Sequence, residues 1–201
     1  MKFVLPVGAV VAVASALPQN LSTPPPAFKI VNVVAGGTGC PKGSIDVNWT
    51  DEKVLPIYYG KEFTAAVGSK AAVTDSRKNC QLNLQLEYSA GYSFAVYSAD
   101  YTGFADLDTG VTGTVKSNYY FSGETDQTSS ALVLSGPTKI KFRKQDNVDI
   151  DVWSPCSGEA LFNVDASVAL TPLAGSANGV LGIARESGRL GSDLYVKWKK
   201  C

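Results

Sequence analysis

The sequence predicts an all-β protein, a single antiparallel β-sandwich with a jelly-roll-like arrangement and disulfide bridges. Three observations support this fold class. Apolar and polar residues alternate along many short segments, turn-forming residues separate those segments, and no stretch shows an amphipathic helical period. Many short strands at regular spacing are typical of sandwiches and jelly rolls.

The clearest strand signal is Gln81–Tyr88, where leucines at every second position alternate with polar residues. The same alternation predicts strands over 148–152, 162–170 and 194–199. Further strands are expected at 30–35, 44–49, 62–67, 92–98, 103–108, 111–121, 131–134, 139–143 and 180–184. Glycine-containing pairs such as Ala90-Gly91 and Ser122-Gly123 supply turns between them.

The first residues indicate the compartment. Residues 1–16 combine a lysine, a short apolar run and a small-residue cleavage site, as a secretory signal peptide does. We therefore expect a secreted, extracellular protein without membrane insertion, because no later stretch approaches the roughly 20 apolar residues of a transmembrane helix. Residues 17–28 are rich in proline and predict a disordered arm, and residues 29–201 form the β-sandwich domain.

Four cysteines, Cys40, Cys80, Cys156 and Cys201, predict two disulfides in a secreted chain. Four cysteines allow three connectivities, and the sequence does not choose among them. Of these we favour Cys40–Cys80 with Cys156–Cys201, because each pair closes one half of the chain. Two sequons, at Asn20 and Asn48, predict glycosylation sites in such a protein.

Charge gives no sign of a nucleic-acid partner. The chain has 18 basic and 18 acidic residues, so it lacks the basic footprint of a nucleic-acid binder. Its densest basic group comprises Lys139, Lys141, Arg143 and Lys144, and it alternates with apolar residues. We interpret this group as the solvated face of a strand.

The stretch Gly36–Ser44 superficially resembles a phosphate-binding loop. A P-loop requires G-x-x-x-x-G-K-S/T between a strand and a helix. Here Pro41 stands at the second glycine position and Gly43 at the hydroxyl position, and the residues that follow alternate as a strand. The glycines are better interpreted as turn residues that lead the chain to Cys40.

Several motifs together resemble one known family. They are GTGCPKGS, DSRKNCQLNLQL, YTGFADLDTGVTGTVKSNYYFSG, WSPC and the terminal WKKC, in this order. The sequence from about Val31 to Cys201 is similar to a fungal secreted family catalogued as domain of unknown function 4360. The resemblance implies a secreted, cysteine-bridged, mostly β protein whose four cysteines match those of the family. It carries over no catalytic residue.

The chain contains no histidine. This excludes Ser-His-Asp and Cys-His catalysis and histidine-ligated zinc, copper or iron. Carboxylate chemistry remains, either as an Asp/Glu pair in glycoside hydrolysis or as oxygen ligands of calcium.

Two acidic groups are candidates for that chemistry. Asp106 and Asp108 lie near Asp100 and share one side of an extended segment, where they are suited to hold Ca²⁺ or orient a sugar. Asp149 and Asp151 follow Asp146 and alternate with apolar residues. The simpler interpretation of both groups is a solvated strand face or strand end. No cofactor is expected, with calcium as the one exception.

Aromatic residues supply the other candidates. Within about thirty residues the chain gathers Tyr97, Tyr101, Tyr119 and Tyr120 with further rings. Adjacent tyrosines in a strand point to opposite faces, so one of Tyr119 and Tyr120 is expected in the core and the other outside. The leading hypothesis is a non-catalytic secreted protein that binds carbohydrate or protein at a cell wall or host surface, and an effector is one version of it. The alternative is a glycan-active enzyme with two carboxylates.

Overall fold

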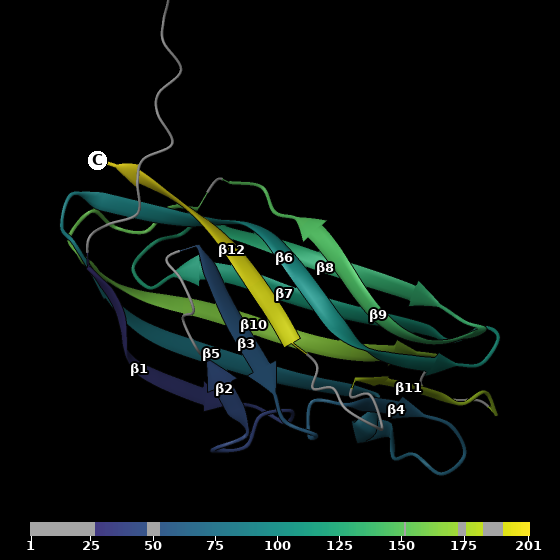
Figure 1. Cartoon of the computed structure of the whole chain (residues 1–201). Coiled ribbons are helices and arrows are strands. Elements are labelled where there is room, and N and C mark those ends of the chain that lie inside the picture. The colour runs from purple at the N-terminus through teal and green to yellow at the C-terminus, as the bar shows by residue number, and fades with distance from the viewer. Residues whose placement is uncertain (1–26, 48–52, 151, 173–175, 183–190) are drawn as a thin grey trace, which may run out of the picture.

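A computed structural model describes residues 27–47, 53–150, 152–172, 176–182 and 191–201. Two antiparallel sheets lie in two layers (Figure 1). The five-stranded sheet has the order β1 (Phe28–Gly36), β5 (Arg77–Tyr88), β10 (Glu159–Thr171), β7 (Thr112–Phe121), β8 (Gln127–Ser135). The predicted all-β sandwich is confirmed.

The seven-stranded sheet is built around β6 (Tyr92–Leu107). Its main path has the order β2 (Ile45–Val47), β3 (Val54–Tyr59), β12 (Gly191–Lys200), β6, β11 (Gly179–Gly182), β4 (Ala65–Val67). The remaining strand, β9 (Thr138–Asn147), pairs with β6 off this path. A short 3₁₀ helix, η1 (Val73–Asp75), precedes β5.

The alternating pattern fills the space between the sheets. The leucines of β5 are fully buried, as are Val164 and Val168 of the neighbouring strand β10. At one end, Phe94 packs edge-on against Phe121 at 5.2 Å between ring centroids and lies 5.0 Å from Trp198. Burying each such side chain contributes about 1.5–3 kcal/mol, so this layer holds the two sheets together.

Two strand predictions differ from the structure, and one strand was missed. The segments 92–98 and 103–108 are one continuous strand, β6, whose pairing with β12 shifts register between Tyr195 and Val196. The alternation at 148–152 does not continue a strand, because β9 ends at Asn147 and Val148 instead donates its backbone N–H to Tyr97. Strand β3 was not predicted, since its run of apolar residues does not alternate.

Both favoured disulfides form. Cys40–Cys80 spans 5.3 Å between Cα atoms and is fully buried, whereas Cys156 and Cys201 are exposed and 6.2 Å apart. The second bridge anchors the end of β12 beside the segment that carries Trp153. Turn glycines act as predicted, because Gly91 and Gly123 have φ angles of 83° and 92°, which favour glycine.

Candidate binding surfaces

The four predicted binding tyrosines do not form one site. Tyr101 and Tyr119 are each 1% exposed and lie between the sheets. Their hydroxyls meet at Ser130, whose Oγ lies 2.9 Å from the hydroxyl of Tyr119. The prediction that these two residues contact a ligand is wrong, because their strand positions point into the core.

Tyr120 lies on the outer face of the five-stranded sheet, opposite its neighbour Tyr119, as the alternation predicted. Its hydroxyl accepts a hydrogen bond of 2.9 Å from Gln81 Nε2. Beside it, Asn163 is buried and its side-chain amide donates to the hydroxyl of Ser122 while accepting from Asn83. We call this surface the amide face. It is defined by Gln81, Asn83, Gln85, Asn118, Tyr120 and Asn163.

The outer face of the seven-stranded sheet carries a different group, in which Tyr97 is the predicted residue. Its ring lies 6.2 Å from that of Tyr195, and both are partly exposed. Strand pairing places Asp193 directly beside Asp100. Arg143 reaches across from β9. We call this group the Arg143 cluster. It consists of Tyr97, Asp100, Arg143, Asp193 and Tyr195.

Asp100 organises the cluster. Its side chain is only 10% exposed, and its Oδ2 accepts from Arg143 Nε at 3.1 Å, from Arg143 Nη2 at 2.9 Å and from the Tyr195 hydroxyl at 3.2 Å. Its Oδ1 is buried without a hydrogen-bond partner among the described residues. Arg143 keeps 64% of its side chain exposed. A buried carboxylate therefore holds an exposed guanidinium in place.

The pKa values of the cluster residues reflect this arrangement. Hydrogen bonding and attraction from Asp100 raise the pKa of Arg143. Partial burial raises the pKa of Asp193, and the negative charge of Asp100 acts in the same direction, although Arg143 at 3.9 Å opposes it. Burial and the charge of Asp100 also raise the pKa of Tyr195. The cluster thus contains one permanent cation, Arg143, and two carboxylates, of which Asp193 has the raised pKa.

Lysines extend the same face along β12. Lys197 Nζ lies 4.7 Å from the centroid of the Tyr97 ring, and Lys199 Nζ lies 3.9 Å from that of Trp153. Both distances are within the range of cation–π attraction. These rings therefore hold ammonium groups at defined places next to the Arg143 cluster.

The predicted carboxylates Asp106 and Asp108 have separate partners, and both precede Asp149 by a full strand. Asp106 pairs with Lys139 at 2.8 Å, and Asp108 Oδ2 accepts from the backbone N–H of Asn178 at 2.7 Å, which lowers the pKa of Asp108. Strand β9 runs from beside Asp106 for about 25 Å before Asp149 follows it. Glycosidase carboxylates lie about 5–9 Å apart, so Asp106 and Asp149 do not face each other as a catalytic pair.

Other predicted positions lie outside the described residues, namely Asp151, the sequons at Asn20 and Asn48, and the signal peptide and most of the arm. Within the described part of the chain, no group of three or more His, Cys, Asp or Glu side chains is placed to hold a metal ion. In that same part, no helix has the length and apolar character needed to cross a membrane.

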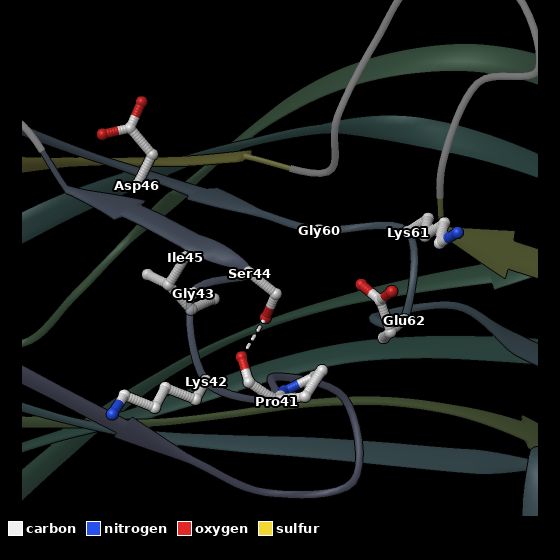
Figure 2. A pocket seen from close by; sticks show the side chains of 9 residues that line it. All are labelled: Pro41, Lys42, Gly43, Ser44, Ile45, Asp46, Gly60, Lys61 and Glu62. Carbon is white, nitrogen blue, oxygen red and sulfur yellow. Dashed lines mark hydrogen bonds between the residues drawn. The ribbon is translucent and has the colours of Figure 1, made fainter.

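The glycine-rich loop lines a surface hollow of about 580 Å³, between Pro41–Asp46 and Gly60–Glu62 (Figure 2). Ser44 Oγ donates to the carbonyl of Pro41 at 2.7 Å, and the loop leads into strand β2. It therefore lacks the helix N-terminus with which a phosphate loop binds its ligand. Figure 2 shows Lys42 extending away from Lys61 and Glu62, so the hollow has no convergent set of cations.

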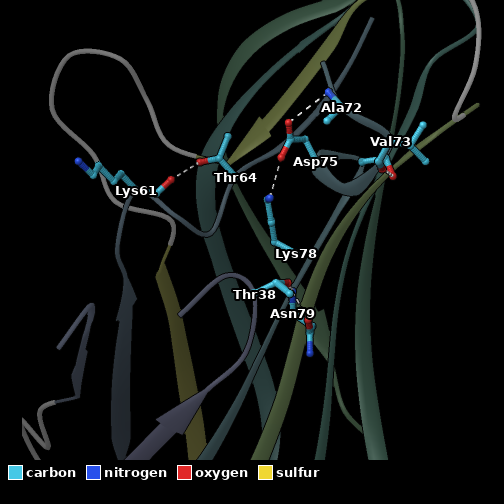
Figure 3. A network of polar contacts seen from close by, with 9 residues as sticks. Thr38, Lys61, Thr64, Ala72, Val73, Asp75, Lys78 and Asn79 are labelled. Atoms are coloured by element: carbon cyan, nitrogen blue, oxygen red, sulfur yellow. Dashed lines mark hydrogen bonds and ion pairs between the residues drawn. The ribbon is translucent and has the colours of Figure 1, made fainter. Parts of the chain in front are cut away.

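The neighbouring polar contacts have a structural role. Thr38 Oγ1 donates to Asn79 Oδ1 at 2.8 Å, next to the Cys40–Cys80 bridge (Figure 3). Asp75 pairs with Lys78 at 2.9 Å and accepts from the backbone of Ala72, and these bonds lower the pKa of Asp75. These contacts attach the loop and the 3₁₀ helix to the start of β5.

Sequence reasoning missed most of the Arg143 cluster. Arg143 was interpreted as part of a solvated strand face, and Tyr195 and Asp193 were not singled out. Only Tyr97 was predicted as a binding residue, and Asp100 was noted beside the other acidic residues. The alternation of β12 does place Tyr195 outside, but the contact between Asp100 and Arg143 depends on the pairing of β6 with β9.

Comparisons with known proteins identify the family. The profile of the domain of unknown function DUF4360 matches residues 26–201. A protein of Arthroderma benhamiae described as an uncharacterized secreted protein is 37% identical over 179 residues, which cover 88% of this chain and 73% of that protein. The chain belongs to the DUF4360 family, as its motifs predicted. It is a secreted, extracellular protein, consistent with its two disulfides.

Among the solved structures to which the chain is similar is that of TmCBM61 in complex with β-1,4-galactotriose. It is 11% identical, covers 86% of this chain and 91% of its own, and has a TM-score of 0.30. At this level of similarity it supports no argument about the ligand of the present protein.

Proposed function

We propose that this protein binds carbohydrate without catalysis, through the outer face of the seven-stranded sheet at the Arg143 cluster. The observation that carries the proposal is the contact between two partly exposed rings, Tyr97 and Tyr195, beside the buried Asp100 that holds Arg143. Ligand sites typically combine aromatic surface with a few fixed polar groups.

The chemistry suits a sugar. Each sugar ring offers apolar C–H faces and hydroxyls that both donate and accept hydrogen bonds. Tyr195 can supply a ring face and Arg143 can supply hydrogen-bond donors. Because Asp100 already fixes the hydroxyl of Tyr195 and the guanidinium of Arg143, little side-chain freedom is lost when a ligand binds.

A retention assay tests the proposal. The folded protein is incubated with insoluble chitin, β-glucan and cellulose and with immobilised acidic polysaccharides, and the bound fraction is measured. Tyr195→Ala should reduce retention at least tenfold, equivalent to about 1.4 kcal/mol. Tyr120→Ala is the matched control, because it removes a partly exposed tyrosine from the opposite face.

Three results would contradict the proposal. Equal loss in the two variants would mean that the Arg143 cluster is not the site. Retention on none of the polymers, together with binding to an extracellular host protein, would favour a protein partner. Steady release of soluble sugars that an Asp→Asn change abolishes would favour the carboxylate enzyme instead.

A further inference from the structure

The outer face of the seven-stranded sheet, which carries the Arg143 cluster, has more cations than carboxylates. That face carries five cations, Lys139, Lys141, Arg143, Lys197 and Lys199, against four carboxylates, Asp46, Asp100, Asp106 and Asp193. Lysine and arginine in the whole chain are balanced by aspartate and glutamate. The cation excess is therefore a local property of this face.

We propose that the glycan bound at the Arg143 cluster is acidic, with the carboxylate of a uronic-acid unit received by Arg143 and Lys197 while its ring contacts Tyr195. This inference rests on the proposed function and specifies its ligand class. Arginine matches a carboxylate through its planar fork of donors, and such charge-assisted pairs are stronger than neutral hydrogen bonds.

The guanidinium of Arg143 is already oriented before a ligand binds. Nε and Nη2 both donate to Asp100, which fixes the plane of the guanidinium while most of the side chain remains exposed. An arginine free to rotate would lose conformational entropy when it bound an anion. Here the buried Asp100 has already imposed that order.

Lys197 supports the same ligand from the neighbouring position. It follows Tyr195 by two residues of β12, a distance of about 7 Å on the same face. Its ammonium group lies over the Tyr97 ring, so a neutral sugar would have to displace a cation to stack there. A carboxylate instead gains an ion pair with that cation, and Tyr195 supplies the apolar contact.

Asp193 sets a limit on anion binding. It lies 3.9 Å from Arg143 and repels an incoming carboxylate. Replacing it by asparagine keeps the shape and removes the repulsion. The Asp193→Asn variant should therefore bind an acidic polymer about two- to fivefold more tightly, which is the opposite of what a sugar-hydroxyl acceptor would show.

The test compares acidic polymers with the same polymers after their carboxylates have been neutralised by esterification. Affinities for polygalacturonate and alginate are measured beside their esterified, uncharged forms, at low salt. The acidic forms should bind at least tenfold more tightly than the esters. Lys197→Gln should reduce this preference severalfold. Lys116→Gln, which removes an exposed lysine from the five-stranded sheet, is the matched control and should leave the preference unchanged.

Arg143→Lys gives a second test, because it retains the charge but loses the planar fork. It should weaken acid binding severalfold. If its melting temperature falls, since Asp100 then loses part of its charge compensation, Lys197→Gln still decides, because Lys197 makes no contact with Asp100 in the described structure.

The outcomes separate the two proposals. Equal binding of acid and ester, lost in Tyr195→Ala, would overturn the acidic ligand and leave carbohydrate binding in place. Equal effects of Lys116→Gln and Lys197→Gln would show non-specific ion exchange and overturn the site. Binding of none of these polymers, with Tyr195-dependent retention on a neutral one, would overturn only the acidic ligand. Retention on no polysaccharide would overturn both proposals.

Discussion

The two outer faces of the sandwich differ in chemistry although the strands behind them follow the same alternation. The amide face consists mainly of neutral side chains that hydrogen-bond to one another, as Asn83, Asn163 and Ser122 do. The other face combines partly exposed rings with a buried carboxylate and an exposed arginine. Core packing requires only the inward residues, so the outward residues are where a binding function can be encoded.

The two faces also differ in the hydrogen-bond partners of their buried polar side chains. Asn163 is buried on the amide face and has partners for its amide donors and its oxygen. Asp100 is nearly as buried, yet its Oδ1 has no hydrogen-bond partner among the residues that the structure describes, and its negative charge is balanced by Arg143. Burying a carboxylate in that position costs free energy. The presence of Asp100 is therefore better explained by its role in positioning Arg143 than by a contribution to stability.

The largest effect should come from the layer between the faces. Tyr119→Ala removes a ring that is 1% exposed and breaks the hydroxyl contacts with Tyr101 and Ser130. It should cost about 3–5 kcal/mol of unfolding free energy. Tyr120→Ala, one residue away, should leave most of that stability. Chemical denaturation of both variants measures the difference, and equal losses would contradict the assignment of the two sides.

The next effect concerns the bridge that anchors the seven-stranded sheet. Replacing Cys156 and Cys201 by serine should cost about 2–5 kcal/mol and weaken the Lys199–Trp153 contact near that end of β12. In the native protein, mild reductant should open this exposed bridge before the buried Cys40–Cys80 bridge, because thiols reach it more easily. Alkylation followed by mass spectrometry shows the order, and earlier labelling of Cys40 would refute it.

The smallest effect concerns pH. Because the pKa of Asp193 is raised on folding, the folded state keeps this proton longer than the unfolded state, and stability falls as pH rises through that window. Asp193→Asn removes the penalised charge. It should stabilise the protein at pH 7 by up to about 0.5 kcal/mol, and the gain should vanish below the ordinary pKa of 3.8. Thermal melts of both proteins across pH measure this, and a loss of stability at pH 7 would contradict it.

The sequence predicted the sandwich because alternation is a local property. The leucines of β5 are inward and fully buried, as their spacing required. The prediction failed where apolar and polar residues alternate outside a strand. Val148 and Val152 are buried, but neither lies in a strand. The sequence pattern also predicted β6 as two strands. The register shift near Tyr195 changes which residues of β6 point inward, so the alternation is interrupted there.

The candidate site was less accessible to prediction. Alternation separates Tyr119 from Tyr120 but does not say which one is inside. To predict the Arg143 cluster, one must know the register of three strands. Asp100, Arg143 and Asp193 are far apart in the chain and meet only through the pairing of β6 with β9 and β12. No local pattern contains that information.

The central claim is that carbohydrate contacts the seven-stranded sheet and not the amide face. The most direct test is an NMR titration of the ¹⁵N-labelled protein with a soluble oligosaccharide from the polymer that retains it best. The account predicts that amide shifts concentrate at Tyr97, Asp100, Arg143 and Tyr195 and that Gln81, Asn83 and Tyr120 remain unchanged. Shifts that concentrate around Tyr120 and Asn163 instead would contradict it.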